Sequence, residues 1–236
     1  MPLPTKKSGK TKGYINKIYL IYGKPKSGKT TLVSNLSADE GDVLFIPTEP
    51  GHKYQDIFKY QVNYKAKVTD KDGNVTEVDA ERDIETWQEY LTAVREFATT
   101  PHSFKMIAID VADRLWGMCS RYVCEKHGIE NESDLPYGKG YKLVKEEFMT
   151  PIDYLAARHY GIVFISHEAT SEVKIGPKTL TYYDTTLPNT AKKAIHGICD
   201  FIFYMHLDAD GRRVLRTKPT ENINAGDRSG KLVDQY

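Results

Sequence analysis

Cysteine is scarce in this sequence, and long hydrophobic runs are absent. The three cysteines in 236 residues are Cys119, Cys124 and Cys199, an odd number without C-x-x-C or zinc spacing, so neither a disulfide framework nor a zinc site is expected. No apolar run approaches the roughly 18 residues of a membrane-spanning helix, and the N-terminus has no hydrophobic signal core. We therefore expect a soluble, cytoplasmic protein without a membrane partner.

Acidic residues are missing from the first seventeen positions, which carry five lysines. The rest of the chain holds 28 basic and 32 acidic residues, so its body is not a general nucleic-acid-binding surface. Residues 1–13 have little to bury and are expected to form a flexible basic arm, either a solvated tail or a contact to a nucleic-acid backbone. With 40% hydrophobic and 28% charged residues overall, residues 14–236 fit one α/β domain.

The most specific motif is residues 23–30, Gly-Lys-Pro-Lys-Ser-Gly-Lys-Thr, which matches the phosphate-loop pattern G-x-x-x-x-G-K-[ST] and follows the apolar run 18–22. In this pattern the glycines let backbone N–H groups surround phosphate oxygens, the lysine places a positive charge near the β- and γ-phosphates, and the hydroxyl binds Mg²⁺. The motif predicts a nucleoside triphosphate, expected to be ATP, together with Mg²⁺. The predicted nucleotide-binding residues are Gly23, Lys24, Pro25, Lys26, Ser27, Gly28, Lys29, Thr30 and Thr31.

Short apolar runs alternate with helical patterns along the chain. Runs that are apolar throughout are typical of strands buried on both faces of a parallel sheet. The pattern therefore predicts an α/β fold with a mostly parallel sheet and helices on both faces. Strands are expected at 18–22, 43–47, 105–110, 161–166 and 201–206, and helices at 86–98, 112–127 and 142–159, the last with Pro151 as a kink or break.

Two segments depart from this alternation and predict β-hairpins. Residues 60–78 alternate polar and apolar side chains around an Asp-Gly-Asn turn at 72–74, which predicts a hairpin inserted into the domain. Residues 201–207 and 212–217 flank the turn sequence Asp-Ala-Asp-Gly, which predicts a second, C-terminal hairpin near the end of the sheet.

Two carboxylates at predicted strand ends complete a candidate hydrolysis site. Asp110 follows four apolar residues and is the predicted Mg²⁺ ligand beside Thr30, because open α/β sheets bind ligands at the carboxyl ends of their strands. Val111 stands next, where many ring ATPases carry a catalytic glutamate, so the base must come from elsewhere. Glu49 ends another strand and is the predicted base that activates water at the γ-phosphate. Asp113 is a weaker candidate.

Residues at two later strand ends extend this prediction. His167, with Ser166 before it, ends the apolar run 162–165 and is placed to sense the γ-phosphate and pass its state to the following loop. Arg216 and Lys218 are predicted to reach the γ-phosphate of a neighbouring subunit as arginine-finger equivalents, which implies a homo-oligomer. The alternatives are a structural histidine and a solvated hairpin edge.

Together these segments resemble the RecA-like ATPases, and more closely the compact phage-type ATP-binding proteins regarded as single-strand annealing or recombination proteins. The resemblance implies a RecA-like P-loop ATPase domain over 14–236, in the host cytoplasm if the gene belongs to a phage. It also implies that Glu49 is the base and that His167 is the sensor, where the family often has Gln. The matching segments are 23–30, 45–49, 107–110, 135–141, 164–168 and 216–218, within a span from about residue 17 to residue 230.

The resemblance further implies that the loop after the sensor binds single-stranded DNA. The corresponding residues 169–191 and the two lysines that follow them interleave cations with tyrosines, which suits a surface that tracks a phosphate backbone and stacks bases. An exposed β-hairpin would show the same pattern. The residues concerned are Lys174, Lys178, Tyr182, Tyr183, Lys192 and Lys193.

The leading hypothesis is therefore a Mg²⁺-dependent, DNA-stimulated ATPase that binds single-stranded DNA and assists recombination, annealing or repair, with a single-strand-binding protein as a candidate partner. One alternative is a small-molecule or nucleotide kinase on the same loop. Arg114 and Arg121 follow Asp110, but the sequence shows no compact arginine-rich lid. The other alternative is a nucleotide-regulated binding module with little turnover.

Overall fold

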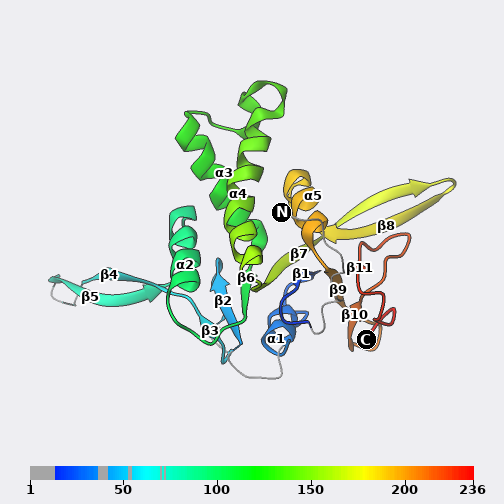
Figure 1. Cartoon of the computed structure of the whole chain (residues 1–236), viewed down its shortest axis with the longest axis horizontal. Coiled ribbons are helices and arrows are strands. Elements are labelled where there is room, and N and C mark those ends of the chain that lie inside the picture. Colours follow the sequence, from blue (N-terminus) through cyan, green and yellow to red (C-terminus); the bar gives the residue numbers. More distant parts are fainter. Residues whose placement is uncertain (1–13, 37–41, 53–54, 70, 72) are drawn as a thin grey trace, which may run out of the picture.

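The centre of the fold is a nine-stranded, mostly parallel β-sheet (Figure 1). The computed structural model describes residues 14–36, 42–52, 55–69, 71 and 73–236, and the expected arm at 1–13 lies outside them. The strand order is β10-β9-β1-β7-β6-β2-β3, with β11 also beside β9 and β8 beside β7. The strands are β1 (Ile18–Gly23), β2 (Val43–Pro47), β3 (Phe58–Lys59), β6 (Met106–Asp110), β7 (Gly161–Ile175), β8 (Lys178–Thr185), β9 (Phe201–Leu207), β10 (Arg213–Arg216) and β11 (Gly226–Asp227).

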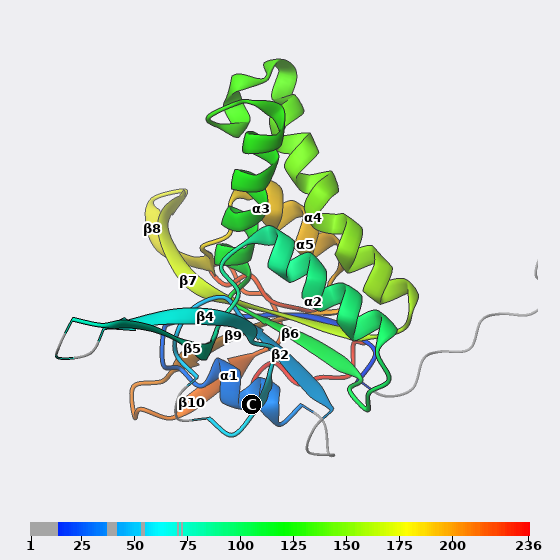
Figure 2. The ribbon, with the colours of Figure 1, turned by 90° about the vertical axis from the view of Figure 1, so that its left-hand side faces the viewer.

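Helices cover both faces of this sheet (Figure 2), which confirms the expected α/β class. On one face α2 to α5 bury an aromatic and aliphatic core against the inner strands, and on the other face α1 packs with Val33 against Tyr19 and Phe45. The strands between these layers are almost wholly apolar because both of their faces are buried. The helices are α1 (Lys29–Ser34), α2 (Trp87–Thr99), α3 (Ala112–His127), α4 (Lys139–Ala157) and α5 (Asn189–Ile198), with short 3₁₀ turns η1 (Glu132–Asp134) and η2 (Pro136–Gly138) between α3 and α4.

Local sequence explains where α2 begins and where α3 ends. Thr86 caps α2 with a reciprocal pair of hydrogen bonds, since its hydroxyl accepts from the Glu89 N–H and the Glu89 carboxylate accepts from the Thr86 N–H, each at 3.2 Å. Arg82 donates to the same carboxylate at 2.6 Å and so ties the preceding strand to the helix. Helix α3 ends at Gly128, which adopts the left-handed conformation that glycine tolerates best.

Helix α4 is not broken at Pro151, where the sequence predicted a kink or break. It begins at Lys139, three residues before the predicted start, and continues through Pro151 to Ala157. Pro151 is buried together with Phe148, Ile152 and Leu155. Tertiary packing of this apolar face therefore stabilises the helix across a residue that removes one backbone hydrogen bond.

The segment after the expected strand 161–166 is not a loop but mostly the exposed β-hairpin that the sequence offered as the alternative. Strand β7 continues to Ile175 and pairs antiparallel with β8, so most of the segment is a long β-hairpin. Helix α5 follows, in a segment where no helix was predicted. Lys192 lies on α5, outside the hairpin, and donates to Asp184 of β8 at 2.7 Å.

Two hairpins project from opposite ends of the molecule (Figure 1). The β7–β8 hairpin lies at one end, and a separate two-stranded sheet of β4 (Val62–Thr69) and β5 (Val75–Arg82) lies at the other. The second hairpin falls where residues 60–78 predicted an insertion, although its return strand runs four residues further. None of the helices in the described part of the chain combines the length and apolar composition that a bilayer crossing requires.

The packing of the helical layer can be tested at Phe148. It is fully buried, and its ring lies 4.9 Å from Trp116, 5.8 Å from Trp87 and 6.5 Å from Phe164 between ring centroids. We expect Phe148→Ala to lower the free energy of unfolding by about 3–5 kcal/mol in urea titrations, because it leaves a cavity. Tyr141→Ala on the same helix is the control, since Tyr141 is 42% exposed. Equal losses in the two variants would contradict the core assignment.

Candidate functional site

The phosphate loop connects β1 to α1 and depends on two glycines. A Cβ atom at Gly23 would lie 2.0 Å from the Met205 carbonyl oxygen of β9, so only glycine allows this close approach. Gly28 begins α1 with φ at +102°, a conformation that side chains disfavour. Both glycines therefore fix the path of the loop, and the N–H groups at the start of α1 are free of helical partners and suited to phosphate.

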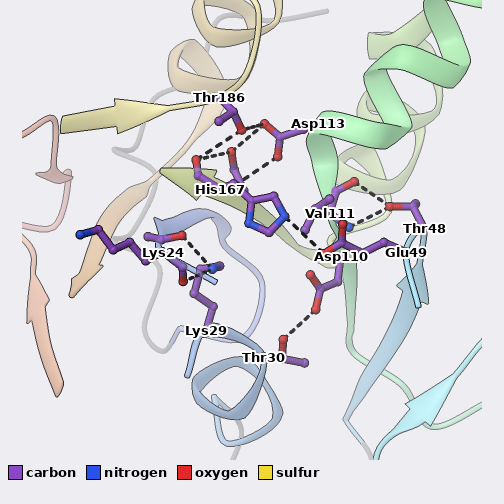
Figure 3. Close-up of polar contacts among 12 residues, drawn as sticks. Lys24, Lys29, Thr30, Thr48, Glu49, Asp110, Val111, Asp113, His167 and Thr186 are labelled. Atoms are coloured by element: carbon purple, nitrogen blue, oxygen red, sulfur yellow. Dashed lines mark hydrogen bonds and ion pairs between the residues drawn. The ribbon is translucent and has the colours of Figure 1, made fainter. Parts of the chain in front are cut away.

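Lys29 is folded into this loop (Figure 3). Its Nζ atom donates to the carbonyl oxygens of Gly23 at 2.8 Å and Lys24 at 2.9 Å. The residue is 6% exposed, and burial lowers the pKa of the ammonium group, while the nearby carboxylates of Asp110 and Glu49 oppose that shift. The structure thus places a buried cation inside the loop that the sequence predicted to hold phosphates.

A hydroxyl and a carboxylate meet beside the loop. Thr30 Oγ1 donates to Asp110 Oδ2 at 2.8 Å. Burial raises the pKa of Asp110 above the usual aspartate range, against the effect of the hydrogen bond from Thr30. Nε2 of the buried His52 lies 3.8 Å from the same carboxylate oxygen. Sequence reasoning missed His52 because it belongs to no recognisable motif.

These two oxygen groups fit a magnesium ion bound with a nucleotide. Mg²⁺ in such sites is held by one or two protein oxygens, by substrate phosphates and by water. In the part of the chain that the structure describes, no three His, Cys, Asp or Glu side chains gather into a complete metal cage. Thr30 and Asp110 would therefore supply the protein ligands, and the phosphates and water would supply the others.

Thr48 joins the ends of β2 and β6 by hydrogen bonds. Its hydroxyl accepts from the Val111 N–H at 2.8 Å and donates to the Val111 carbonyl at 2.9 Å, and its own N–H donates to the Asp110 carbonyl at 2.8 Å. The peptide bond between Asp110 and Val111 is cis. These three contacts hold Asp110 beside Glu49, so Thr48 is a site residue that the sequence did not single out.

Glu49 and His167 face each other across the strand ends (Figure 3). Glu49 Oε1 lies 3.3 Å from His167 Nε2, and both side chains are about one-third exposed, at 33% and 29%. Asp113 lies behind them and accepts from the Ser166 hydroxyl at 3.0 Å, from the His167 N–H at 3.4 Å and from the Thr186 hydroxyl. The structure thus brings the predicted base and the predicted sensor together, and it gives Asp113 the role of holding the sensor strand.

Among the described residues, no hydrogen bond or ion pair joins Arg216 or Lys218 to the loop of their own chain. In the β9–β10 pairing Arg216 lies opposite Tyr204, away from the carboxyl end of β9, and Lys218 Nζ lies 3.4 Å from the fully buried carboxylate of Asp227. Arg213 contacts the loop instead, since its Nε donates to the Ser27 carbonyl at 3.1 Å. The sequence missed Arg213 because the register of the hairpin decides which arginine lies at the loop.

The sheet, the phosphate loop and the pairing of Thr30 with Asp110 define a P-loop nucleotide-binding α/β protein. Residues 15–229 match the family described as an AAA domain, and the chain belongs to that family of P-loop NTPases. No curated protein matches this chain. The crystal structure of the RadB recombinase is similar over 86% of this chain and 80% of its own, with 12% identity and a TM-score of 0.46. That structural similarity is too low to indicate a shared function.

Thr48 provides a test of the site architecture that does not depend on activity. We expect Thr48→Val to lower the free energy of unfolding by about 1–3 kcal/mol, because the buried Val111 N–H loses its partner. Thr48→Ser keeps the hydroxyl and should remain close to the native value. Urea unfolding of the three proteins measures the difference. If Thr48→Val is as stable as Thr48→Ser, the hydroxyl does not hold the two strand ends together.

Proposed function

We propose that the protein is a Mg²⁺-dependent ATPase of the RecA-like core that binds single-stranded DNA and assists recombination, annealing or repair. The observation that supports this best is the convergence of Thr30 with Asp110, and of Glu49 with His167, around one phosphate loop. Membership of a P-loop NTPase family supports the nucleotide part of the proposal. The resemblance of the sequence to compact phage-type recombination proteins supports the DNA part.

Each residue of the site has a distinct role in hydrolysis. Lys29 and the N–H groups of the loop would bind the triphosphate, and Thr30 and Asp110 would hold a Mg²⁺ ion, which would offset the negative charge of the phosphates. The Glu49 carboxylate orients the attacking water and accepts its proton. His167 lies against Glu49, so it is placed to respond both to the γ-phosphate and to the state of the base.

The β7–β8 hairpin is the proposed DNA-binding element. Lys174 and Lys178 are exposed on it, and Tyr182 and Tyr183 lie on its return strand. Thr186, at its root, donates to Asp113, which also accepts from the His167 N–H. A strand of DNA bound on the hairpin would therefore act on a segment that is hydrogen-bonded to the sensor.

Assembly of several copies belongs to the same proposal. Among the described residues, Arg216 and Lys218 make no hydrogen bond or ion pair with the loop of their own chain, and the proposal assigns their contact to the γ-phosphate of a neighbouring subunit. A single-strand-binding protein is the proposed partner on DNA, and the host cytoplasm is the proposed location if the protein is phage-encoded.

The role of Glu49 is tested by Glu49→Gln. We expect ATP hydrolysis to fall by about 10²- to 10⁴-fold while ATP binding is retained, because glutamine can orient water but cannot accept its proton. Phosphate release and binding of a fluorescent ATP analogue are measured, with Glu85→Gln as the control, since the Glu85 side chain is 63% exposed. Unchanged hydrolysis would remove Glu49 as the base, and transfer of phosphate to a nucleoside or nucleotide would favour a kinase.

The DNA role is tested by the salt dependence of binding. Replacing both Lys174 and Lys178 by Ala should reduce the slope of log K against log salt by about 1.4 for single-stranded DNA, roughly 0.7 for each lost phosphate contact. Lys65→Ala with Lys67→Ala on the β4–β5 hairpin is the matched control. If native protein shows neither binding at low salt nor stimulation of hydrolysis, the DNA part of the proposal fails.

The role of Arg216 across a subunit interface is tested by mixing. Glu49→Gln and Arg216→Ala should each be nearly inactive alone, whereas a mixture should recover part of the activity, because some interfaces then pair an intact base with an intact arginine. Phosphate release is measured over a range of protein concentrations, and circular dichroism checks that both variants are folded. A mixture no more active than its components would place Arg216 outside the neighbouring site.

A further inference from the structure

A second cavity lies beside the phosphate loop, on the side of β9. Its volume is about 430 Å³, which is within the range of small-molecule sites. Because β9 and β7 flank β1 on opposite sides, this cavity lies across the loop from Asp110, Glu49 and His167. Figure 3 shows the Lys24 side chain extending away from those residues. None of the side chains that are assigned a role in hydrolysis lines the cavity.

Aromatic rings form one wall of this cavity. Tyr204 stacks on His206 with 5.1 Å between ring centroids and an interplanar angle of 13°, and Tyr183 stacks on Tyr204 at 5.5 Å and 29°. Tyr22 supports the wall from β1, at 5.0 Å from Tyr204. Flat rings held nearly parallel present the kind of surface on which a planar heterocycle stacks.

Polar groups complete the lining. Ser27 Oγ and His206 Nε2 are buried and have no hydrogen-bond partner among the described residues. Lys24 and Lys26 are exposed at the same cavity. These three features match the parts of a nucleotide unit. The aromatic wall suits a planar base, the unsatisfied hydrogen-bonding atoms suit the polar edge of that base, and the two cations suit a phosphate.

The aromatic wall is also connected to the sensor strand. The Tyr204 hydroxyl donates to Glu168 Oε2 at 2.8 Å, and Glu168 directly follows His167. The Tyr183 backbone is held by the Tyr22 hydroxyl at 3.2 Å and by pairing with residues 222–224. Occupation of the cavity would therefore act on groups that are fixed to the strand carrying His167.

We infer that this cavity is a nucleobase slot, in which a base lies along Tyr183 and His206 and a phosphate lies near Lys24 and Lys26. Two sources have this chemistry, namely a base of bound single-stranded nucleic acid and the base of ATP itself. The inference rests on the proposed nucleotide and DNA binding, and it adds the site at which a base is recognised.

The experiment compares ligands with and without a base. A short single-stranded oligonucleotide carrying 2-aminopurine is titrated into the full chain, beside an abasic strand of the same length, and ATP is compared with inorganic tripolyphosphate. The variants are Tyr183→Leu and His206→Ala, with Tyr64→Leu on β4 as the control because Tyr64 is 41% exposed. Tyr183→Leu keeps apolar bulk and removes the flat ring, and thermal unfolding verifies that each variant is folded.

If a strand supplies the base, both slot variants should bind the 2-aminopurine strand roughly 5- to 150-fold more weakly and lose its fluorescence quenching, while the abasic strand binds all proteins equally. If ATP supplies the base, the two slot variants should bind ATP more weakly than the native protein and bind tripolyphosphate equally well. Equal binding of base-bearing ligands by native protein and slot variants overturns the inference. If the native protein binds no DNA, or hydrolyses no ATP, that part of the proposed function fails instead. The slot is then tested with whichever base-bearing ligand the native protein still binds.

Discussion

The parallel register of β1, β7, β6 and β2 determines where every polar group of the site lies. Gly23 pairs with His167, Asp110 pairs with Ile165, and Pro47 pairs with Asp110, so β1, β6 and β2 end beside residues 165–167 of the longer strand β7. Because side chains alternate between the faces of a strand, a slip of one residue in any pair would turn a functional side chain to the other face. The buried apolar residues of both layers fix this register.

Charge at the strand ends is strongly unbalanced. The carboxylates of Glu49, Asp110 and Asp113 surround Lys29, whose ammonium group already donates to two loop carbonyls. A triphosphate placed in the loop would add further negative charge beside these acids. A divalent cation between Asp110 and the phosphates would offset that repulsion, which explains in electrostatic terms why a hydroxyl and a carboxylate lie side by side there.

Local motifs could be read from the sequence, whereas contacts between distant residues could not. The phosphate loop follows from eight consecutive residues, and the positions of Asp110 and Glu49 follow from apolar strands that end together. The contact of Thr48 with Val111 joins residues 63 positions apart, and Thr186 and Asp113 are 73 apart. Whether Arg213 or Arg216 contacts the loop depends on the register of the β9–β10 hairpin, which the sequence does not give. Helix α5 was not predicted, although its residues form an amphipathic pattern.

Strand β7 is one uninterrupted element of 15 residues that begins inside the core and ends on a projecting hairpin. His167 and Lys174 lie on it seven positions apart, which corresponds to about 23 Å of extended chain. The strand is uninterrupted between them, so a residue beside the phosphate loop and a residue exposed on the hairpin share one continuous, hydrogen-bonded backbone.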